Sequence, residues 1–274
     1  MIRKRKRALQ LGMLPGSGRC KVTEKLKVRH TGNAGVLLYI EGKALGIDAL
    51  CHDPEGIYRS TSEEEKEEIL REIEERRLEA LVFTHEHRDH FWLEAVLEAL
   101  ERNPRLLIIS GREVCRKIRE RAKEAVLYEI VPEEKKTVRI RFPREDTELC
   151  FFNSPHMGEA YQEIQNLACL AEIKGRRLFI PGDARPDGEL FRRAADWSAE
   201  IDCLVAPFPL IGLPSARKEL SAALRIRQIM ALHLPLPERD PQDWVGSARR
   251  VCNQTQDGLP NPLFAFGGGT ELLL

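Results

Sequence analysis

Hydrophobic and polar residues follow two different periods along the chain, and these periods predict where strands and helices lie. Short apolar, β-prone runs predict strands, whereas apolar residues three or four positions apart predict helices. The predicted strands cover residues 21–28, 36–40, 44–47, 80–84, 106–109, 126–131, 137–142, 148–153, 167–173, 177–180, 202–206, 228–233 and 263–266. The predicted helices cover residues 63–79, 91–100, 112–123, 187–195, 216–227 and 241–252. A strand-rich first quarter followed by alternating strands and helices indicates sheets covered by helices in layers.

The connecting segments show no clear domain boundary. Residues 207–214 and 234–241 contain prolines, and we expect both to be loops because strand and helix patterns resume directly on either side. There is no internal repeat at the period of a solenoid. We therefore expect one domain over residues 21–274, preceded by a basic arm at residues 1–20.

Composition places the chain among ordinary globular proteins. Its 274 residues include 43 basic and 43 acidic side chains, and 42% of the residues are hydrophobic, which argues against a disordered chain. The neutral total hides an asymmetry, because residues 1–29 carry ten Lys or Arg and the single acid Glu24. This arm could bind phosphate backbones. A solvated chain end explains the same charges, and we prefer that explanation.

The sequence also bears on the compartment and on membranes. No apolar run approaches the roughly 18 residues that span a bilayer, and the start of the chain lacks the apolar stretch of a signal peptide. The seven cysteines are odd in number and never form a Cys-x-x-Cys pair. This pattern disfavours a disulfide framework, and we predict a cytoplasmic protein without a membrane partner. The sequence leaves the oligomeric state open.

One segment carries a high density of metal-binding side chains. Three of the seven histidines and an aspartate follow the predicted strand 80–84, in the order His85, His87, Asp89 and His90. His85 and His87 are two positions apart, so an extended chain points both the same way. Imidazole and carboxylate groups bind divalent cations such as zinc. A chance cluster on a solvated loop is the alternative, but four potential ligands in this order favour a metal site.

This segment resembles the signature of the metallo-β-lactamase fold hydrolases, a superfamily that usually binds two metal ions. Residues 32–35 (GNAG) and 46–48 (GID) are similar to the opening hairpin of that family, so the resemblance spans roughly residues 30–270. It implies an α/β fold, a four-layer αββα sandwich of two mixed β-sheets flanked by helices. The chain has no room for the helical substrate domain of glyoxalase II or the extra domain of RNA-cleaving relatives. It therefore looks like the compact, lactonase-like members.

The resemblance implies further ligands, each at the end of a strand. The candidates are His156 in the segment NSPHMG, Asp183 in PGDA and His233 after the strand 228–233. Asp48 would support the ligands without binding a metal itself. Carried over residue by residue, one metal would be bound by His85, His87 and His156, the other by Asp89, His90 and His233, with Asp183 and a water bridging the two.

The implied chemistry is hydrolysis without an organic cofactor. Two divalent cations lower the pKa of a shared water from about 15.7 to about 7, and the resulting hydroxide would attack a carbonyl carbon or a phosphorus. Asp183 would bridge the metals, Asp89 would orient the nucleophile, and His233 or a metal-bound water would assist the leaving group. We expect zinc, with iron or manganese as alternatives, because histidine and aspartate suit all three.

The predicted activity is therefore that of a metal-dependent hydrolase acting on an ester, lactone or phosphodiester of a small molecule. Two alternatives remain open. A compact phosphodiesterase or nuclease would use the basic arm, and its binding to nucleic acid should weaken steeply with added salt and with deletion of residues 1–8. A non-catalytic metal-binding protein would stay folded without turning over any substrate of these classes.

A few other residues have weaker signals. For His30 and His52, we expect structural or surface roles. Cys51 and Cys169 lack an activating partner in the sequence, so we expect both to be packing residues. Glu159, Tyr161 and Asn166 follow His156 and could reach a substrate, although ordinary loop polarity explains them equally well.

Overall fold

Two seven-stranded β-sheets form the centre of the molecule in a computed structural model that describes residues 25–131, 136–142 and 146–274. In spatial order, the first sheet contains β14 (Glu271–Leu273), β1 (Lys27–Gly32), β2 (Gly35–Ile40), β3 (Lys43–Ile47), β4 (Leu78–Phe83), β5 (Leu107–Ser110) and β6 (Val126–Glu129). The second contains β13 (Leu263–Phe264), β12 (Arg225–Leu232), β11 (Glu200–Pro207), β10 (Arg176–Ile180), β9 (Gln165–Ile173), β8 (Thr147–Pro155) and β7 (Val138–Phe142). Both sheets are mixed, since β3–β6 and β10–β13 pair in parallel and the other neighbours are antiparallel.

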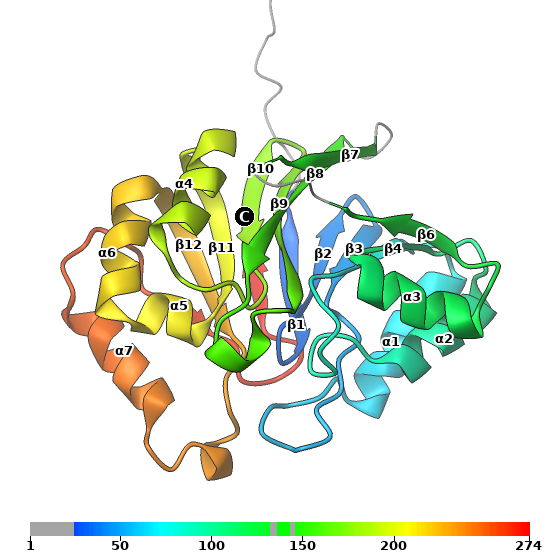
Figure 1. Cartoon of the computed structure of the whole chain (residues 1–274), viewed down its shortest axis with the longest axis horizontal. Helices are drawn as coiled ribbons and strands as arrows, with labels where there is room; N and C mark the ends of the chain where they lie inside the picture. Colours follow the sequence, from blue (N-terminus) through cyan, green and yellow to red (C-terminus); the bar gives the residue numbers. More distant parts are fainter. Residues whose placement is uncertain (1–24, 132–135, 143–145) are drawn as a thin grey trace, which may run out of the picture.

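Helices cover the outer face of each sheet (Figure 1). The first sheet is covered by α1 (Glu63–Glu74), α2 (Leu93–Arg102) and α3 (Arg112–Arg121). The second is covered by α4 (Gly188–Trp197), α5 (Phe208–Gly212), α6 (Pro214–Ala223) and α7 (Trp244–Gln254), and two short 3₁₀ helices are η1 (Glu159–Tyr161) and η2 (Pro237–Arg239). The predicted αββα sandwich is confirmed.

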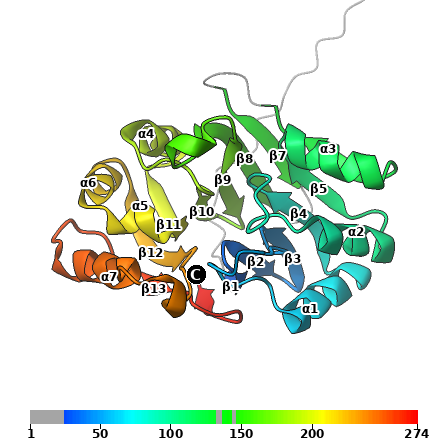
Figure 2. The same cartoon turned by 60° about the horizontal axis from the view of Figure 1, so that its bottom comes forward.

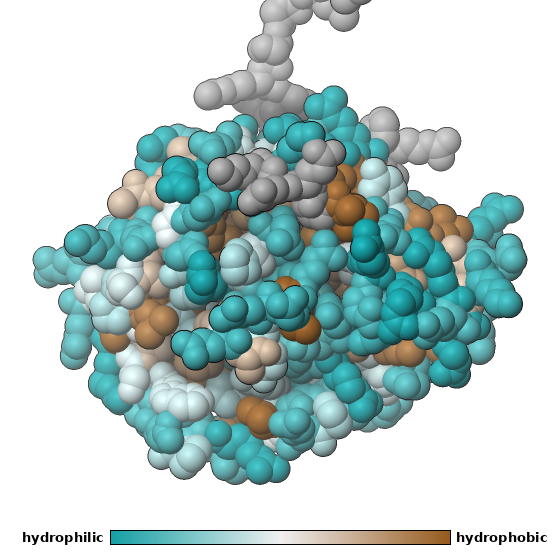
Figure 3. Space-filling view, viewed as in Figure 1, coloured by the Kyte–Doolittle hydropathy of each residue, from teal (hydrophilic) through white to brown (hydrophobic). Residues whose placement is uncertain are grey.

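Each sheet is buried on both faces, which explains the continuous apolar runs in the sequence. Neighbouring residues of one strand therefore pack into different layers. Leu38 and Phe151 belong to the central core between the sheets, whereas Leu37 packs against α1–α3 and Phe152 against the helices of the second sheet. The surface in Figure 3 is mostly hydrophilic, with small scattered apolar patches. Within the described part of the chain, none of the helices is long and apolar enough to cross a membrane.

Several predicted element boundaries were wrong. The helix predicted over 63–79 begins with a capping box at Ser62 and Glu65 but ends at Glu74, because Arg76 has a positive φ of 56° and the chain then enters β4. The helix predicted over 216–227 likewise ends at Ala223, before β12. Residues 21–24 of the first predicted strand and the whole basic arm lie outside the described residues.

The segment 207–214 was expected to be a loop and instead contains α5 and the start of α6. Pro209 and Pro214 lie in the first turns of these helices, where a proline removes no helical hydrogen bond. Leu210 and Ile211 are buried and fix α5 against the second sheet. The strand β14 was not predicted, since its three residues pair only with the first half of β1.

A buried ion pair joins three helices of the second layer. The Arg217 side chain on α6 is fully buried and donates from Nε and Nη2 to the two carboxylate oxygens of Asp257, at 2.7 and 2.9 Å. Its Nη1 also donates to the Ile211 carbonyl at the end of α5 and lies 3.2 Å from the Cys252 Sγ on α7. Arg217 therefore fixes α5 and α7 relative to each other.

We expect Asp257→Asn to lower the free energy of unfolding by about 3–5 kcal/mol, because it leaves the buried Arg217 without its counter-charge. Urea unfolding followed by circular dichroism measures the effect. Glu200→Gln, which breaks the exposed pair with Arg225, is the control and should cost less than about 1 kcal/mol. Equal losses in the two variants would contradict the structural role of Arg217.

Five strands end at one edge of the sandwich, which Figure 2 brings forward. The strands β3 and β4 run parallel in the first sheet, and β8, β10 and β12 run in one direction in the second. The segments that follow these strands contain all the residues predicted to bind or support metals. The sheet topology thus places residues far apart in the sequence at a common edge.

Candidate metal centre

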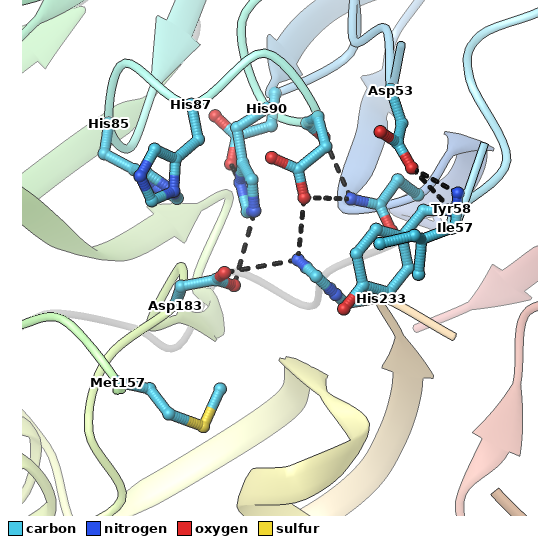
Figure 4. A network of polar contacts seen from close by, with 12 residues as sticks. Asp53, Ile57, Tyr58, His85, His87, His90, Met157, Asp183 and His233 are labelled. Atoms are coloured by element: carbon cyan, nitrogen blue, oxygen red, sulfur yellow. Dashed lines mark hydrogen bonds and ion pairs between the residues drawn. The ribbon is translucent and has the colours of Figure 1, made fainter. Parts of the chain in front are cut away.

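The structure brings all seven predicted ligands together at this edge. They form three overlapping groups whose ligand atoms lie within 4.8 Å of one another: His85, His87 and His156; His85, His90 and Asp183; and Asp89, His90 and His233. Figure 4 shows Asp183 between the histidines of the 85–90 segment and His233. The first and third groups contain the same residues as the two predicted ligand sets. That they bind metals remains a prediction.

The first group has the spacing of ligands around one cation. His85 Nε2 lies 3.1 Å from His87 Nδ1 and 3.3 Å from His156 Nε2. Nitrogen atoms bound at 2.0–2.1 Å to a tetrahedral ion are about 3.4 Å apart, so these separations suit a shared metal. The other ring nitrogen of His156 donates to the Met157 carbonyl at 2.6 Å, which leaves Nε2 free to act as a ligand.

The third group is joined to the first through Asp183. The His233 Nε2 lies 3.2 Å from both Asp89 Oδ2 and Asp183 Oδ2. The other oxygen, Asp183 Oδ1, lies 3.3 Å from His90 Nε2, while Oδ2 is 3.7 Å from His156 Nε2. The Asp183 carboxylate therefore faces ligands of both groups, as a bridging residue would.

Several polar atoms of the site have no protein partner although they are buried. Among the described residues, His90 Nε2, His233 Nε2 and Asp183 Oδ1 have no hydrogen-bond partner. Buried polar atoms are rarely left unpaired, and each such atom needs an explanation. A divalent cation bound by nitrogen and oxygen lone pairs supplies one, so the residues present fit a metal.

Strained or constrained backbone positions aim the ligands. His233 has a positive φ of 59°, and its backbone N–H donates to the Asn33 carbonyl. Gly182 has a φ of 59° as well, and a Cβ there would lie 2.5 Å from Asn166 Oδ1. Non-glycine residues in this region cost free energy, and such positions cluster at functional sites.

Asn166 fixes the loop that carries Asp183. Its Oδ1 accepts a hydrogen bond from the Asp183 backbone N–H at 3.0 Å, and its Nδ2 donates to the Pro181 carbonyl at 2.9 Å. The side chain is fully buried, so it positions Asp183 rather than reaching a substrate. Glu159 is exposed on η1. The ring of Tyr161 packs against two histidine rings, with its centroid 5.0 Å from that of His87 and 5.1 Å from that of His156.

The two histidines and two cysteines for which the sequence predicted no metal-binding role have packing roles. His30 is buried, with its ring nitrogens 2.9 Å from the Gly267 and Asn33 carbonyls, and His52 stacks on Trp92. Cys51 and Cys169 are buried, and burial raises the pKa of both thiols. None of these four side chains belongs to the three ligand groups.

A cleft of about 690 Å³ opens beside the ligands. Asp183, His156 and His233 form its inner end, and its other lining residues are mostly apolar side chains from η1, α5, α7 and the segments around Tyr58 and Pro235. The ring of Tyr58 packs edge-on against His233, with centroids 4.2 Å apart. Tyr58 was not singled out in the sequence, because an isolated tyrosine in a loop carries no pattern.

Comparison with solved structures identifies the fold. The metallo-β-lactamase fold protein YhfI from Bacillus subtilis superposes with a TM-score of 0.61 at 13% identity, over 92% of this chain and all of that one. The chain has the metallo-β-lactamase fold. A metallo hydrolase, Igni18, from the archaeon Ignicoccus hospitalis gives a TM-score of 0.62 at 14% identity, over 91% of this chain and 98% of the other.

A third similar structure is an isothiocyanate hydrolase from Delia radicum gut bacteria. It gives a TM-score of 0.60 at 15% identity, over 90% of this chain and 98% of that chain. No family model matches the sequence, and no curated protein matches it. The predicted resemblance to this fold is therefore confirmed by structure, at sequence identities that show the fold alone.

Within this metallo-β-lactamase fold, Asp48 anchors the site from the first sheet. Its Oδ1 accepts a hydrogen bond from the Thr84 N–H at 2.8 Å, and its Oδ2 accepts from the Thr84 hydroxyl at 2.7 Å. The same Oδ2 lies 2.8 Å from His90 Nδ1. A proton held at Nδ1 by Asp48 leaves Nε2 of His90 as the ligand atom. Thr84, which the sequence did not reveal, thus helps to orient the ligands.

Charges within the cluster shift the pKa values of its members in opposite directions. Burial lowers the pKa of His85 well below its usual range, and nearby His90 lowers it further. Burial opposes protonation of His90 and His233 as well, but Asp183 and the other carboxylates outweigh it. They raise the pKa of His90 well above its usual value and that of His233 to about 10. Despite burial, the neighbouring His233 lowers the pKa of Asp89 to about 2.

We predict that metal binding strengthens as the pH rises. At pH 7 and without a cation, the raised pKa values keep His90 and His233 protonated, whereas Asp89 and Asp183 are already ionised. Filling both ligand groups should therefore release about two protons per chain, and binding should weaken as the pH falls. Calorimetric titration with zinc in buffers of different ionisation enthalpy counts the protons. Zinc uptake without proton release would contradict this charge assignment.

We expect Asp48→Asn to weaken metal binding by about 10–100-fold, because the amide no longer holds a proton on His90 Nδ1. Zinc affinity measured by competition with a chromogenic chelator tests this. Asp53→Asn, on the neighbouring loop, is the control, since Asp53 accepts only backbone hydrogen bonds and lies outside the ligand groups. The same loss in both variants would show that Asp48 acts only on folding.

Proposed function

We propose that this protein is a metal-dependent hydrolase with a two-cation centre that cleaves an ester, lactone or phosphodiester of a small molecule. One observation carries the proposal: two groups of candidate ligands, buried except for the half-buried His87 and Asp89, face the Asp183 carboxylate at the inner end of a cleft. Fold neighbours that are described as metallo hydrolase and isothiocyanate hydrolase support the reaction class. The substrates of these neighbours are not carried over to this chain.

Different residues of the site would have different roles in the reaction. Cations bound at such a site lower the pKa of a coordinated water and stabilise negative charge on the attacked group. Asp183 holds the two ligand groups at a fixed separation. Asp89, whose low pKa keeps it ionised at neutral pH, orients the nucleophile by accepting a hydrogen bond. His233 lies between these carboxylates and Tyr58, where it would help to hold a cation, and a coordinated water would supply the proton of the leaving group.

The cleft favours a small molecule over a polynucleotide. Its volume of about 690 Å³ lies within the range of about 300–1,000 Å³ that is typical of small-molecule sites. Arg239 is the only lysine or arginine among its lining residues in the described chain, and it donates to the Glu55 and Gly56 carbonyls. A groove for a nucleic acid would present a row of basic side chains to the phosphates. The basic arm lies outside the described residues.

We expect Asp183→Asn to lower kcat by more than about a hundredfold. Loss of a residue that only supports a metal ligand lowers activity by about 10–100-fold, and loss of the bridging ligand itself should cost more. Metal content measured by elemental analysis should fall from two ions per chain to one or fewer, with the circular dichroism spectrum unchanged. The substrates are matched esters, lactones and phosphodiesters.

The control for this variant is Asp196→Asn, an exposed residue on α4, which should keep both activity and metal content. Full activity in Asp183→Asn would contradict the bridging role. A wild-type protein that binds two metals and turns over none of these substrates would instead support a non-catalytic metal-binding protein.

A further inference from the structure

The cleft has an apolar rim in addition to its metal-binding end. Leu213, at the start of α6, and Trp244, at the start of α7, line it on one side. Met157 and Tyr161 line it next to His156, and Figure 4 shows Met157 below Asp183. Ile57 completes the rim beside Tyr58. The apolar surface is therefore continuous with the ligand groups.

Three of these hydrophobic side chains have large exposed fractions, unlike the buried residues of the core. Tyr161 and Leu213 are 46% exposed, and Trp244 is 55% exposed. The other large exposed hydrophobic residues of the described chain lie elsewhere: on or just after β6, on or just after β13, and on β14. Exposed apolar side chains gathered around a concave site indicate a binding surface.

The backbone holds Trp244 in place at this rim. The Asp240 carboxylate accepts hydrogen bonds from the backbone N–H groups of Trp244 and Val245, at 2.8 and 3.0 Å, and so caps α7. Arg217 fixes α7 against α5 from the other side, through Cys252 and the Ile211 carbonyl. The indole is thus presented to solvent by a fixed helix start. A rigid aromatic side chain binds an apolar group at a small cost in conformational entropy.

We propose that the rim formed by Leu213, Trp244 and Tyr161 is a subsite for an uncharged apolar group, alkyl or aryl, attached to the bond that is hydrolysed. This inference rests on the proposed function. The occupant is part of the substrate because the rim continues directly into Asp183, His156 and His233. Arg239 does not oppose an uncharged group, since its side chain is braced by the Glu55 and Gly56 carbonyls.

The test uses straight-chain hydroxamic acids of two to eight carbons, which bind metals without being cleaved. Calorimetry on the full zinc-loaded chain gives their affinities. Each pair of methylene groups that the rim buries should tighten binding by about tenfold. We expect Trp244→Ala and Leu213→Ala to weaken binding of the eight-carbon compound by at least about fivefold and to leave the two-carbon compound unchanged.

The matched control is Tyr128→Ala, which removes an aromatic side chain of similar exposure (42%) from β6, on the far edge of the first sheet. It should leave the whole series unchanged. Equal affinity for short and long chains in the wild type would overturn the subsite. So would a dimer that Trp244→Ala dissociates without changing ligand preference, because the rim would then contact a second copy.

Turnover separates this inference from the proposed function. Esters of the same chain lengths are assayed in parallel with the binding series. Preference for long chains in both assays supports the two proposals together. Hydrolysis without any preference in either assay removes the subsite and keeps the hydrolase. Binding that prefers long chains, without hydrolysis of any ester, lactone or phosphodiester, keeps the subsite and removes the hydrolase.

Discussion

The structure depends on the burial of nitrogen and oxygen atoms that face one another at the spacing of metal ligands. His85, His87 and His156 lie at ligand spacing, and Asp183 faces histidines on both sides. Bringing such groups together out of water costs free energy unless a cation compensates them. The central core between the sheets, with residues such as Leu38 and Phe151 from the two sides, holds the five strand ends in the alignment that this requires.

The sequence predicted much of this arrangement, for physical reasons that can be named. Strands buried on both faces give uninterrupted apolar runs, so most of them were found within a few residues of their observed positions. The 85–90 segment is local, and its spacing alone indicates a metal site. His156, Asp183 and His233 needed the family resemblance, because a single histidine or aspartate after a strand has no distinctive pattern.

Other features depend on tertiary contacts that no local pattern encodes. The helix α5 forms in a proline-containing segment because Leu210 and Ile211 reach a buried position on the second sheet. The role of Thr84 follows from Asp48, which is 36 residues away in the sequence. Tyr58 reaches the site because its segment pairs with Pro235 in an isolated bridge. Asn166, for which the sequence left open either a contact with substrate or ordinary loop polarity, supports Asp183 from the second sheet.

The buried Arg217 has a consequence for how this site can change. The candidate ligands come from strand ends, whereas much of the apolar rim comes from the starts of α6 and α7. The Arg217–Asp257 ion pair holds these two helices together with α5. Under the two proposals, reactivity and selectivity would therefore reside in separate structural units. Replacing rim side chains would then change which molecules are accepted and leave the metal-binding geometry intact, so that few mutations would give a new specificity.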